Sequence, residues 1–212
     1  MEQQILSPGS TFADLSKKAW HDLSGKWGWC ILAEIIVTAI CFGAKIIPVV
    51  RIFSDILLFP LSVGKILLYL RVTRNEPISL AALFEPFNQY VRMIWGGIAV
   101  GALIILGYLL LIIPGIIFSL RYSMTFYIML DDPQCKVSEA LKESRAIMYG
   151  HKLAMFLYGL AWCLAAAAVT VCTLGIGLIW LCPLIATFWA NFYLSVKRQD
   201  VQPECESAQL NI

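Results

Sequence analysis

The sequence predicts an all-α fold: a polytopic transmembrane helical bundle of six spans, arranged as three helical hairpins with amphipathic interfacial helices. Three observations predict it. The 212 residues are 59% hydrophobic and 14% charged, whereas soluble domains carry about 25% charged residues. Residues 153–196 contain no Asp, Glu, Lys, Arg or His. Basic residues gather in alternate connecting segments, which is typical of proteins that cross a membrane several times.

The uncharged run at 153–196 is too long for one crossing. As a single helix it would reach roughly 66 Å, and the hydrocarbon core of a bilayer is about 30 Å thick. The run divides naturally at Thr-Leu-Gly-Ile-Gly, residues 173–177, because the two glycines permit a tight turn. We therefore predict the fifth and sixth spans at Leu153–Val171 and Ile176–Val196.

Four earlier apolar segments complete the set of spans. The first two are predicted at Trp27–Ala44 and Ile52–Leu70. The apolar block 93–130 contains one charged residue, Arg121. We expect this block to break at Pro114-Gly115, because proline disrupts the preceding helix and glycine permits a turn. The third and fourth spans are then Met93–Ile113 and Ile116–Leu130.

The distribution of Lys and Arg predicts the orientation of the bundle. Twelve of these residues lie in the N-terminal segment, the second and fourth connections and the C-terminal tail, whereas Lys45 and Arg51 lie on the opposite side. Because basic residues favour the cytoplasmic side, we expect a bacterial cytoplasmic (inner) membrane protein with both termini in the cytoplasm. The predicted domains are a cytoplasmic amphipathic segment at 1–26, a six-span domain at 27–198, and a disordered cytoplasmic tail at 199–212.

Three cytoplasmic segments have the apolar spacing of amphipathic helices, and each precedes one predicted hairpin. The first carries apolar side chains at positions 12, 15, 19 and 23 after a capping residue, Thr11. The second covers residues 78–87 and is expected to end near Pro86. The third covers residues 137–148, with Ser138 as the expected cap. We expect all three to lie on the inner leaflet of the membrane.

Several motifs of the chain are similar to those of a known family. They are Ile113-Pro114-Gly115, Asp131-Asp132-Pro133, Ser144-Arg145, Met148-Tyr149-Gly150-His151-Lys152 and Leu174-Gly175-Ile176-Gly177. Together they resemble DUF975, a bacterial membrane family of unknown function. The resemblance implies a polytopic protein of the bacterial cytoplasmic membrane. It implies no reaction, cofactor or catalytic residue.

Four charged residues fall inside predicted spans, where charge is costly and therefore indicates a candidate functional site. Glu34 and Lys65 would lie at a similar depth on adjacent antiparallel helices, so they could form a pair. Asp55 and Arg121 would share a depth on the other side of the membrane. One hypothesis is an ion or proton pathway in which the carboxylates change charge. The other is that the pairs are structural and neutralise each other.

Asp131, Asp132 and His151 bracket the connection after the fourth span and are weak candidates for a metal site. Two carboxylates and an imidazole could hold a divalent cation, but Asp-Asp-Pro is also an ordinary turn sequence. The seven cysteines include no C-x-x-C pair, which argues against a zinc site or a disulfide framework. We expect no bound metal and no cofactor.

The sequence leaves two classes of function open. It contains no metalloprotease, hydrolase, P-loop or dinucleotide-binding motif, so we expect a protein that is not an enzyme. It is either a scaffold, accessory or envelope factor that acts by contacts within the membrane, or a small transporter or channel that uses the intramembrane charges. The expected partners are the lipid bilayer and another membrane protein or a second copy. Gly97-x-x-x-Gly101 favours close helix packing within the chain or in a homo-oligomer. The net charge of +2 is too small to favour nucleic acid.

Overall fold

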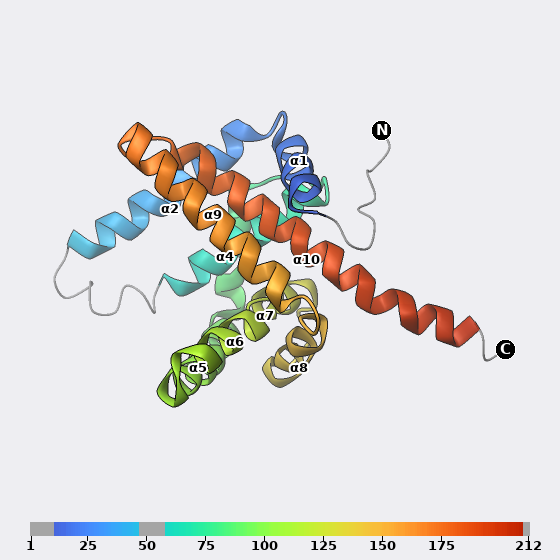
Figure 1. Ribbon diagram of the computed structural model, residues 1–212. Coiled ribbons are helices and arrows are strands. Elements are labelled where there is room, and N and C mark those ends of the chain that lie inside the picture. Colours follow the sequence, from blue (N-terminus) through green and yellow to red (C-terminus); the bar gives the residue numbers. More distant parts are fainter. Residues whose placement is uncertain (1–10, 47–57, 210–212) are drawn as a thin grey trace.

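The structure is a computed structural model that describes residues 11–46 and 58–209. The predicted all-α class is confirmed, because these residues form helices and no strand. The helices (Figure 1) are α1 (Phe12–Leu23), α2 (Trp27–Ile46), α4 (Phe59–Thr73), the 3₁₀ helices η1 (Leu80–Leu83) and η2 (Glu85–Gln89), α5 (Tyr90–Leu110), α6 (Ile112–Tyr122), α7 (Thr125–Asp131), α8 (Val137–Ile147), α9 (Lys152–Thr173) and α10 (Leu178–Gln209).

Five stretches of the described chain are long and apolar enough to cross a membrane. The predicted second span, Ile52–Leu70, begins in residues that the structure does not describe, and its described part lies in α4, which has 15 residues. Such a helix reaches roughly 22 Å, which is less than the thickness of a bilayer core. The five stretches are Trp27–Lys45, Leu80–Leu110, Ile112–Asp131, Lys152–Thr173 and Leu178–Arg198.

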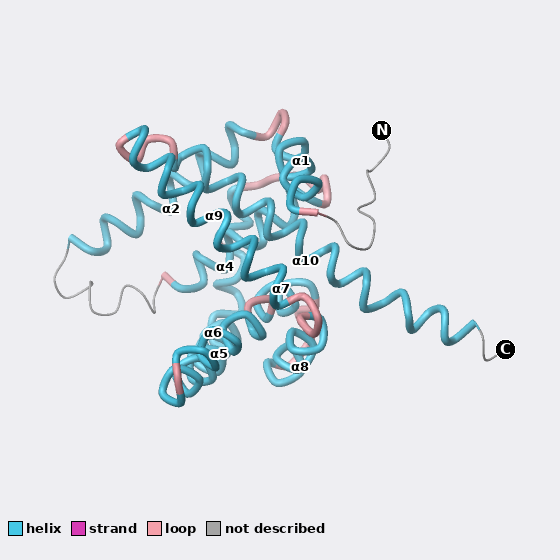
Figure 2. Tube along the Cα trace, in the orientation of Figure 1, coloured by secondary structure: helices cyan, strands magenta, loops and turns pink. Residues whose placement is uncertain are grey.

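The helices converge at one side of the molecule and separate at the other. Figure 1 shows the turn between α5 and α6, the turn between α9 and α10, and the facing ends of α2 and α4 at the left of the view. Helices α1 and α8 lie nearer the opposite side. Figure 2 shows that the described connections are short compared with the helices. We call the side with these two tight turns the tip side, and we call the side where α1 and α8 lie the base side.

The break between α5 and α6 lies upstream of the predicted position. The chain reverses at Leu111, which has an extended backbone, and not at Pro114-Gly115. Proline is tolerated in the first turn of a helix because its missing N–H has no partner there, so Pro114 can lie inside α6. A Cβ on Gly107 would lie 2.4 Å from Phe118, and one on Gly115 would lie 2.5 Å from Tyr108. Both glycines are therefore needed for the close contact between α5 and α6.

The turn between the last two spans is confirmed at the predicted residues. Helix α9 ends at Thr173 and α10 begins at Leu178, with Leu174 and Gly175 at positive φ. The predicted disorder of residues 199–212 differs from the structure, in which α10 continues to Gln209. No glycine follows Gly177 in the sequence, so the residue that most often ends a helix is absent from this segment.

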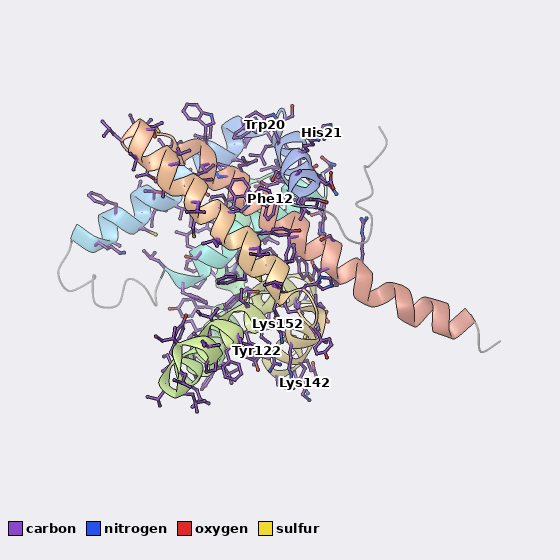
Figure 3. All side chains as sticks on the ribbon, viewed as in Figure 1. Phe12, Trp20, His21, Tyr122, Lys142 and Lys152 are labelled. Atoms are coloured by element: carbon purple, nitrogen blue, oxygen red, sulfur yellow. The ribbon has the colours of Figure 1, made fainter. Side chains whose placement is uncertain are left out.

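Helix α1 forms at the predicted residues, but its apolar face is covered by protein and not left for lipid. Leu15, Ala19 and Leu23 are buried, and α1 packs mainly on α10. The Phe12 ring lies 5.5 Å from the ring of Trp162 and 5.3 Å from that of Phe188, and Figure 3 shows Phe12 on the inner side of α1. The prediction that this helix lies on the leaflet by its apolar face is therefore wrong.

The other two amphipathic segments differ in detail from the prediction. Residues 78–87 include the 3₁₀ helix η1 and the start of a second one, η2, and Pro86 lies in the first turn of η2 instead of ending a single helix. Helix α8 is capped by Lys136, whose N–H donates to Glu139, and not by Ser138. Ala140, Ser144 and Ile147 of α8 are buried, so this face of the helix, like that of α1, packs on protein and not on lipid.

A buried polar pair joins α1 to α10. The Asn191 Nδ2 donates to the Asp22 Oδ2 at 2.8 Å, and both residues are buried. The Asn191 Oδ1 has no hydrogen-bond partner among the described residues. Burial raises the pKa of the Asp22 carboxyl above its ordinary value, although the hydrogen bond from Asn191 and the charge of Lys18 act in the opposite direction.

We expect Asp22→Asn to stabilise the fold at neutral pH by about 1 kcal/mol, because the new amide could also donate to the Asn191 Oδ1. Burial raises the pKa of Asp22 in the folded protein. The protonated carboxyl therefore contributes its full stabilisation below the unfolded pKa, and this stabilisation is lost as the pH rises through the folded pKa. The stability advantage of Asp22→Asn over the parent should therefore shrink near about pH 4, where Asp22 of the parent is also neutral. Thermal unfolding in detergent at neutral pH and at about pH 4 measures this advantage, with Glu143→Gln as the control. Lower stability of the Asp22→Asn variant than of the parent at neutral pH would contradict the prediction.

Candidate functional site

The structure brings Glu34 of α2 together with Lys65 and Tyr69 of α4. The Lys65 Nζ lies 2.7 Å from the Glu34 Oε2, and the Tyr69 hydroxyl donates to the Glu34 Oε1 at 2.8 Å. Glu34 and Tyr69 are buried, and 30% of the Lys65 side chain is exposed. The predicted proximity of Glu34 and Lys65 is therefore confirmed.

Helical spacing explains why these three side chains meet. Lys65 and Tyr69 are four residues apart and so lie on the same face of α4. That face is directed at α2 at the level of Glu34, where a lone carboxylate would be costly to bury. With one oxygen accepting from an ammonium and the other from a hydroxyl, the Glu34 carboxylate is well satisfied. Loss of either partner would leave charge in an apolar environment.

A cavity of about 710 Å³ opens beside this cluster. Helix α2 contributes Glu34, Thr38, Cys41 and Lys45, and α4 contributes Ser62, Lys65, Ile66 and Tyr69. Helix α10 supplies an apolar wall that includes Ile185 and Trp189. The volume falls within the range of small-molecule pockets, about 300–1,000 Å³. The cavity can therefore accommodate a small molecule next to the part-buried pair of Glu34 and Lys65.

The other predicted intramembrane pair includes Asp55, which lies outside the described residues. Arg121 lies near the end of α6, where its backbone carbonyl accepts a hydrogen bond from the Ser144 hydroxyl of α8 at 3.0 Å. Its Nε is buried without a hydrogen-bond partner in the part of the chain that the structure describes. Arg121 therefore packs beside α8.

Asp131 is the centre of a separate polar cluster. Its side chain is 8% exposed and accepts from Arg74, which follows α4, and from Tyr193 and Lys197 of α10, the last two at 2.8 Å. The carboxylate thus joins the ends of α4 and α7 to α10. Because three donors already use its two oxygens, Asp131 is a structural anchor in this structure.

The weak metal candidates are not brought together. The Asp132 carboxylate accepts the Gln134 N–H at 2.8 Å, which is a turn that follows α7, and His151 is the residue that precedes α9, beyond the far end of α8. The described residues contain no group of three His, Cys, Asp or Glu side chains that could hold a metal ion. The alternative interpretation of Asp-Asp-Pro as a turn that ends a helix fits the structure.

Three important residues were not predicted from the sequence. Tyr69 could have been found, because it lies four residues after Lys65 on the same helix face. Arg92 donates to the carbonyls of Met129, Asp132 and Cys135 and so satisfies the C-terminal end of α7. No sequence signal indicates this contact, because it joins residues about 40 positions apart. Asn191 was likewise hidden within an apolar run.

The glycines of the third span pack within the chain. A Cβ on Gly97 would lie 2.9 Å from the Phe59 ring of α4, and one on Gly96 would lie 2.8 Å from the Met129 sulfur. Gly101 has nothing within 4 Å of its added Cβ. The Gly97-x-x-x-Gly101 pattern is thus partly explained by contact between α5 and α4 in one chain.

The long apolar helices, with a part-buried ion pair between α2 and α4, define a multi-pass membrane protein. A family model described as "Protein of unknown function (DUF975)" matches residues 45–200, and the chain belongs to this family. The predicted resemblance is therefore confirmed. Comparison with curated proteins and with solved structures finds no match.

We expect Glu34→Gln alone to destabilise the protein by about 3 kcal/mol, because it leaves the Lys65 ammonium without its partner. The double variant Glu34→Gln with Lys65→Met should recover most of this loss, since no unpaired charge remains. Chemical unfolding in detergent of Glu34→Gln, of Lys65→Met and of the double variant gives the coupling energy between the two residues. Glu85→Gln, which breaks a more exposed pair with Arg71, serves as control and should cost less than about 1 kcal/mol. Additive effects at Glu34 and Lys65 would contradict the prediction.

Proposed function

We propose that the chain is a six-span protein of the bacterial inner membrane, with both termini in the cytoplasm, which acts by binding other molecules and not by catalysis. Contacts on the base side support this orientation. The Lys26 Nζ donates to the Val72 carbonyl and to Asn75 at 3.1 and 2.9 Å. Asp131 joins Arg74 to Lys197. These residues come from the four segments whose positive charge favours the cytoplasm.

The main proposal is a scaffold, accessory or envelope factor that acts by contacts. The observation that carries it is a layer of short helices on the base side, formed by α1, η1, η2, α8 and the contacts of Lys26 and Asp131. We propose that this layer faces the cytoplasm and call it the cytoplasmic layer. Because ion pairs and hydrogen bonds fix this layer to the spans, its outer faces need little ordering when they bind a partner. Helix α8 presents Lys142 and Arg145 outward, and Tyr149 beyond it is 80% exposed. Figure 3 labels Lys142 on the outer side of α8.

We expect a photo-crosslinking amino acid at Tyr149 to form a discrete protein adduct in intact cells. Charge reversal by Lys142→Glu with Arg145→Glu should lower the adduct yield about tenfold, because complementary charge steers association. Gel analysis with mass spectrometry measures the adduct. The same amino acid at Trp95, a 62% exposed residue of α5, is the control for random membrane encounters. The same adducts from both positions, insensitive to the charge reversal, would contradict a specific contact.

A second candidate is a small transporter or channel, and the cavity beside Glu34 and Lys65 favours it. Ionisable residues inside membranes often mark substrate or ion pathways. Proteoliposomes loaded with a pH-sensitive dye would test proton movement under an imposed membrane potential. Flux that is lost in the folded Glu34→Gln, Lys65→Met double variant would support transport. Equal flux from both proteins would contradict it.

A further inference from the structure

The charged residues that line the cavity already have partners. The two oxygens of Glu34 accept from Lys65 and from Tyr69. Lys45, the other charged residue of the lining, also has an interaction partner. An ion that entered the cavity would therefore meet no unpaired opposite charge among these residues, and an uncompensated charge in an apolar environment is costly. The charge balance of the cavity favours an uncharged occupant.

Two hydroxyl groups of the lining differ from those of other helices. Ser and Thr side chains within a helix can donate to a carbonyl about one turn earlier, as Thr170 of α9 and Ser119 of α6 do at 2.7 and 2.8 Å. The side-chain hydroxyls of Thr38 and Ser62 form no hydrogen bond with the part of the chain that the structure describes. Because an unbonded hydroxyl is unfavourable in an apolar environment, these two groups favour an occupant that can form hydrogen bonds.

The two hydroxyls lie on the same side of the ion pair. Thr38 follows Glu34 by about one turn of α2, and Ser62 precedes Lys65 by about one turn of α4. Helix α2 ends and α4 begins on the tip side (Figure 1). Both hydroxyls are therefore displaced from the ion pair toward the tip side, and they line the same cavity from two helices. A polar headgroup at this level would meet a hydroxyl on each helix.

The apolar part of the lining sets the second requirement. Helix α10 contributes Ile185, Ala186 and Trp189, which lie within a stretch long and apolar enough to span the membrane. A hydrocarbon chain along these residues would stay in an environment like lipid. A small hydrophilic molecule would leave this wall without apolar contact, and a pure hydrocarbon would leave the hydroxyls unbonded. A neutral amphiphile meets both requirements.

We propose that this cavity binds an uncharged single-chain amphiphile of the monoacylglycerol type, which hydrogen-bonds to Thr38 and Ser62 and lays its apolar chain along α10. The volume of about 710 Å³ is that of a site for one small molecule, which favours one chain over two. The inference concerns binding alone, and it stands whether or not the bound molecule crosses the membrane. It goes beyond the proposed contact function, because the cavity and α8 share no lining residue.

Quenching of Trp189 fluorescence tests the proposal. The purified full chain is placed in vesicles of dioleoyl phosphatidylcholine that contain a rising fraction of a monoacylglycerol with a brominated chain. Bromine quenches only nearby indoles, so Trp189→Phe removes the signal from the cavity and identifies it. Trp95→Phe, on α5 and outside the lining, is the matched control and should keep this signal. Unlabelled monoacylglycerol is then added as a competitor.

The expected result is quenching of Trp189 that saturates and that the unlabelled monoacylglycerol reverses. An alkyl sulfate and an alkyl trimethylammonium with the same brominated chain, which carry opposite permanent charges, should each bind at least about tenfold more weakly. The double variant Thr38→Val with Ser62→Ala removes both hydroxyls from exposed positions and should bind the monoacylglycerol at least about tenfold more weakly.

Two variants serve as controls. Thr170→Val with Ser119→Ala removes two hydroxyls that lie outside the lining, and it should bind as the parent does. Lys142→Glu with Arg145→Glu should also bind as the parent does, which separates this test from the test of the contact function.

Three results would overturn the proposal. The first is quenching that does not saturate and is not reversed by the competitor, which would mean partition into the bilayer only. The second is binding of either charged probe as tight as that of the monoacylglycerol. The third is unchanged affinity of the Thr38→Val, Ser62→Ala protein when its unfolding transition shows that it is folded.

Discussion

Lipid cannot solvate a charge, and this constraint explains where the polar contacts of the protein lie. The chain carries few ionisable residues within its apolar stretches, and Glu34 is buried with both carboxylate oxygens bonded. The other strong cluster, around Asp131, lies where α7 ends and links α4 to α10. Apolar contacts alone give a helix little preference for another helix over lipid, because both surfaces are apolar. The polar contacts therefore determine which helices meet and at what level.

The same constraint produces the two features that we connect with function. On the base side, hydrogen bonds and ion pairs hold α1, α8 and the ends of α4 and α7 in place. Within the bundle, the pair of Glu34 and Lys65 lies at the edge of a cavity and not in a filled interior. The Lys65 side chain is 30% exposed and lines this cavity.

Much of the fold follows from the sequence, because length and hydropathy identify helices that lipid accepts. The turn at 173–177 was predictable, since Gly175 adopts the positive φ that glycine allows. The Glu34–Lys65 pair was predictable from depth alone. The break near Pro114 was misplaced because proline fits either before a turn or in the first turn of a helix, and the choice depends on the contact of Gly107 with α6.

The roles of Asp131 and Asn191 were not predictable, because their partners lie far away in the sequence. Arg74 and Lys197 are separated from Asp131 by 57 and 66 positions, and Asp22 is 169 positions from Asn191. Local patterns identify such residues as unusual but do not identify their partners. The same holds for α1, whose amphipathic pattern fits a lipid surface as well as it fits the protein surface that covers it.

The central proposal is that the ends of α4 and α7 meet α10 at the cytoplasmic face. Labelling of single cysteines tests it directly, in a protein whose seven native cysteines are replaced. The new cysteines are Gln134→Cys, beside the Asp131 cluster, and Leu174→Cys, at the tip between α9 and α10. A membrane-impermeant maleimide applied to intact cells should label position 174, and it should label position 134 only after the cells are permeabilised. Labelling of position 134 in intact cells, with position 174 protected, would contradict the account.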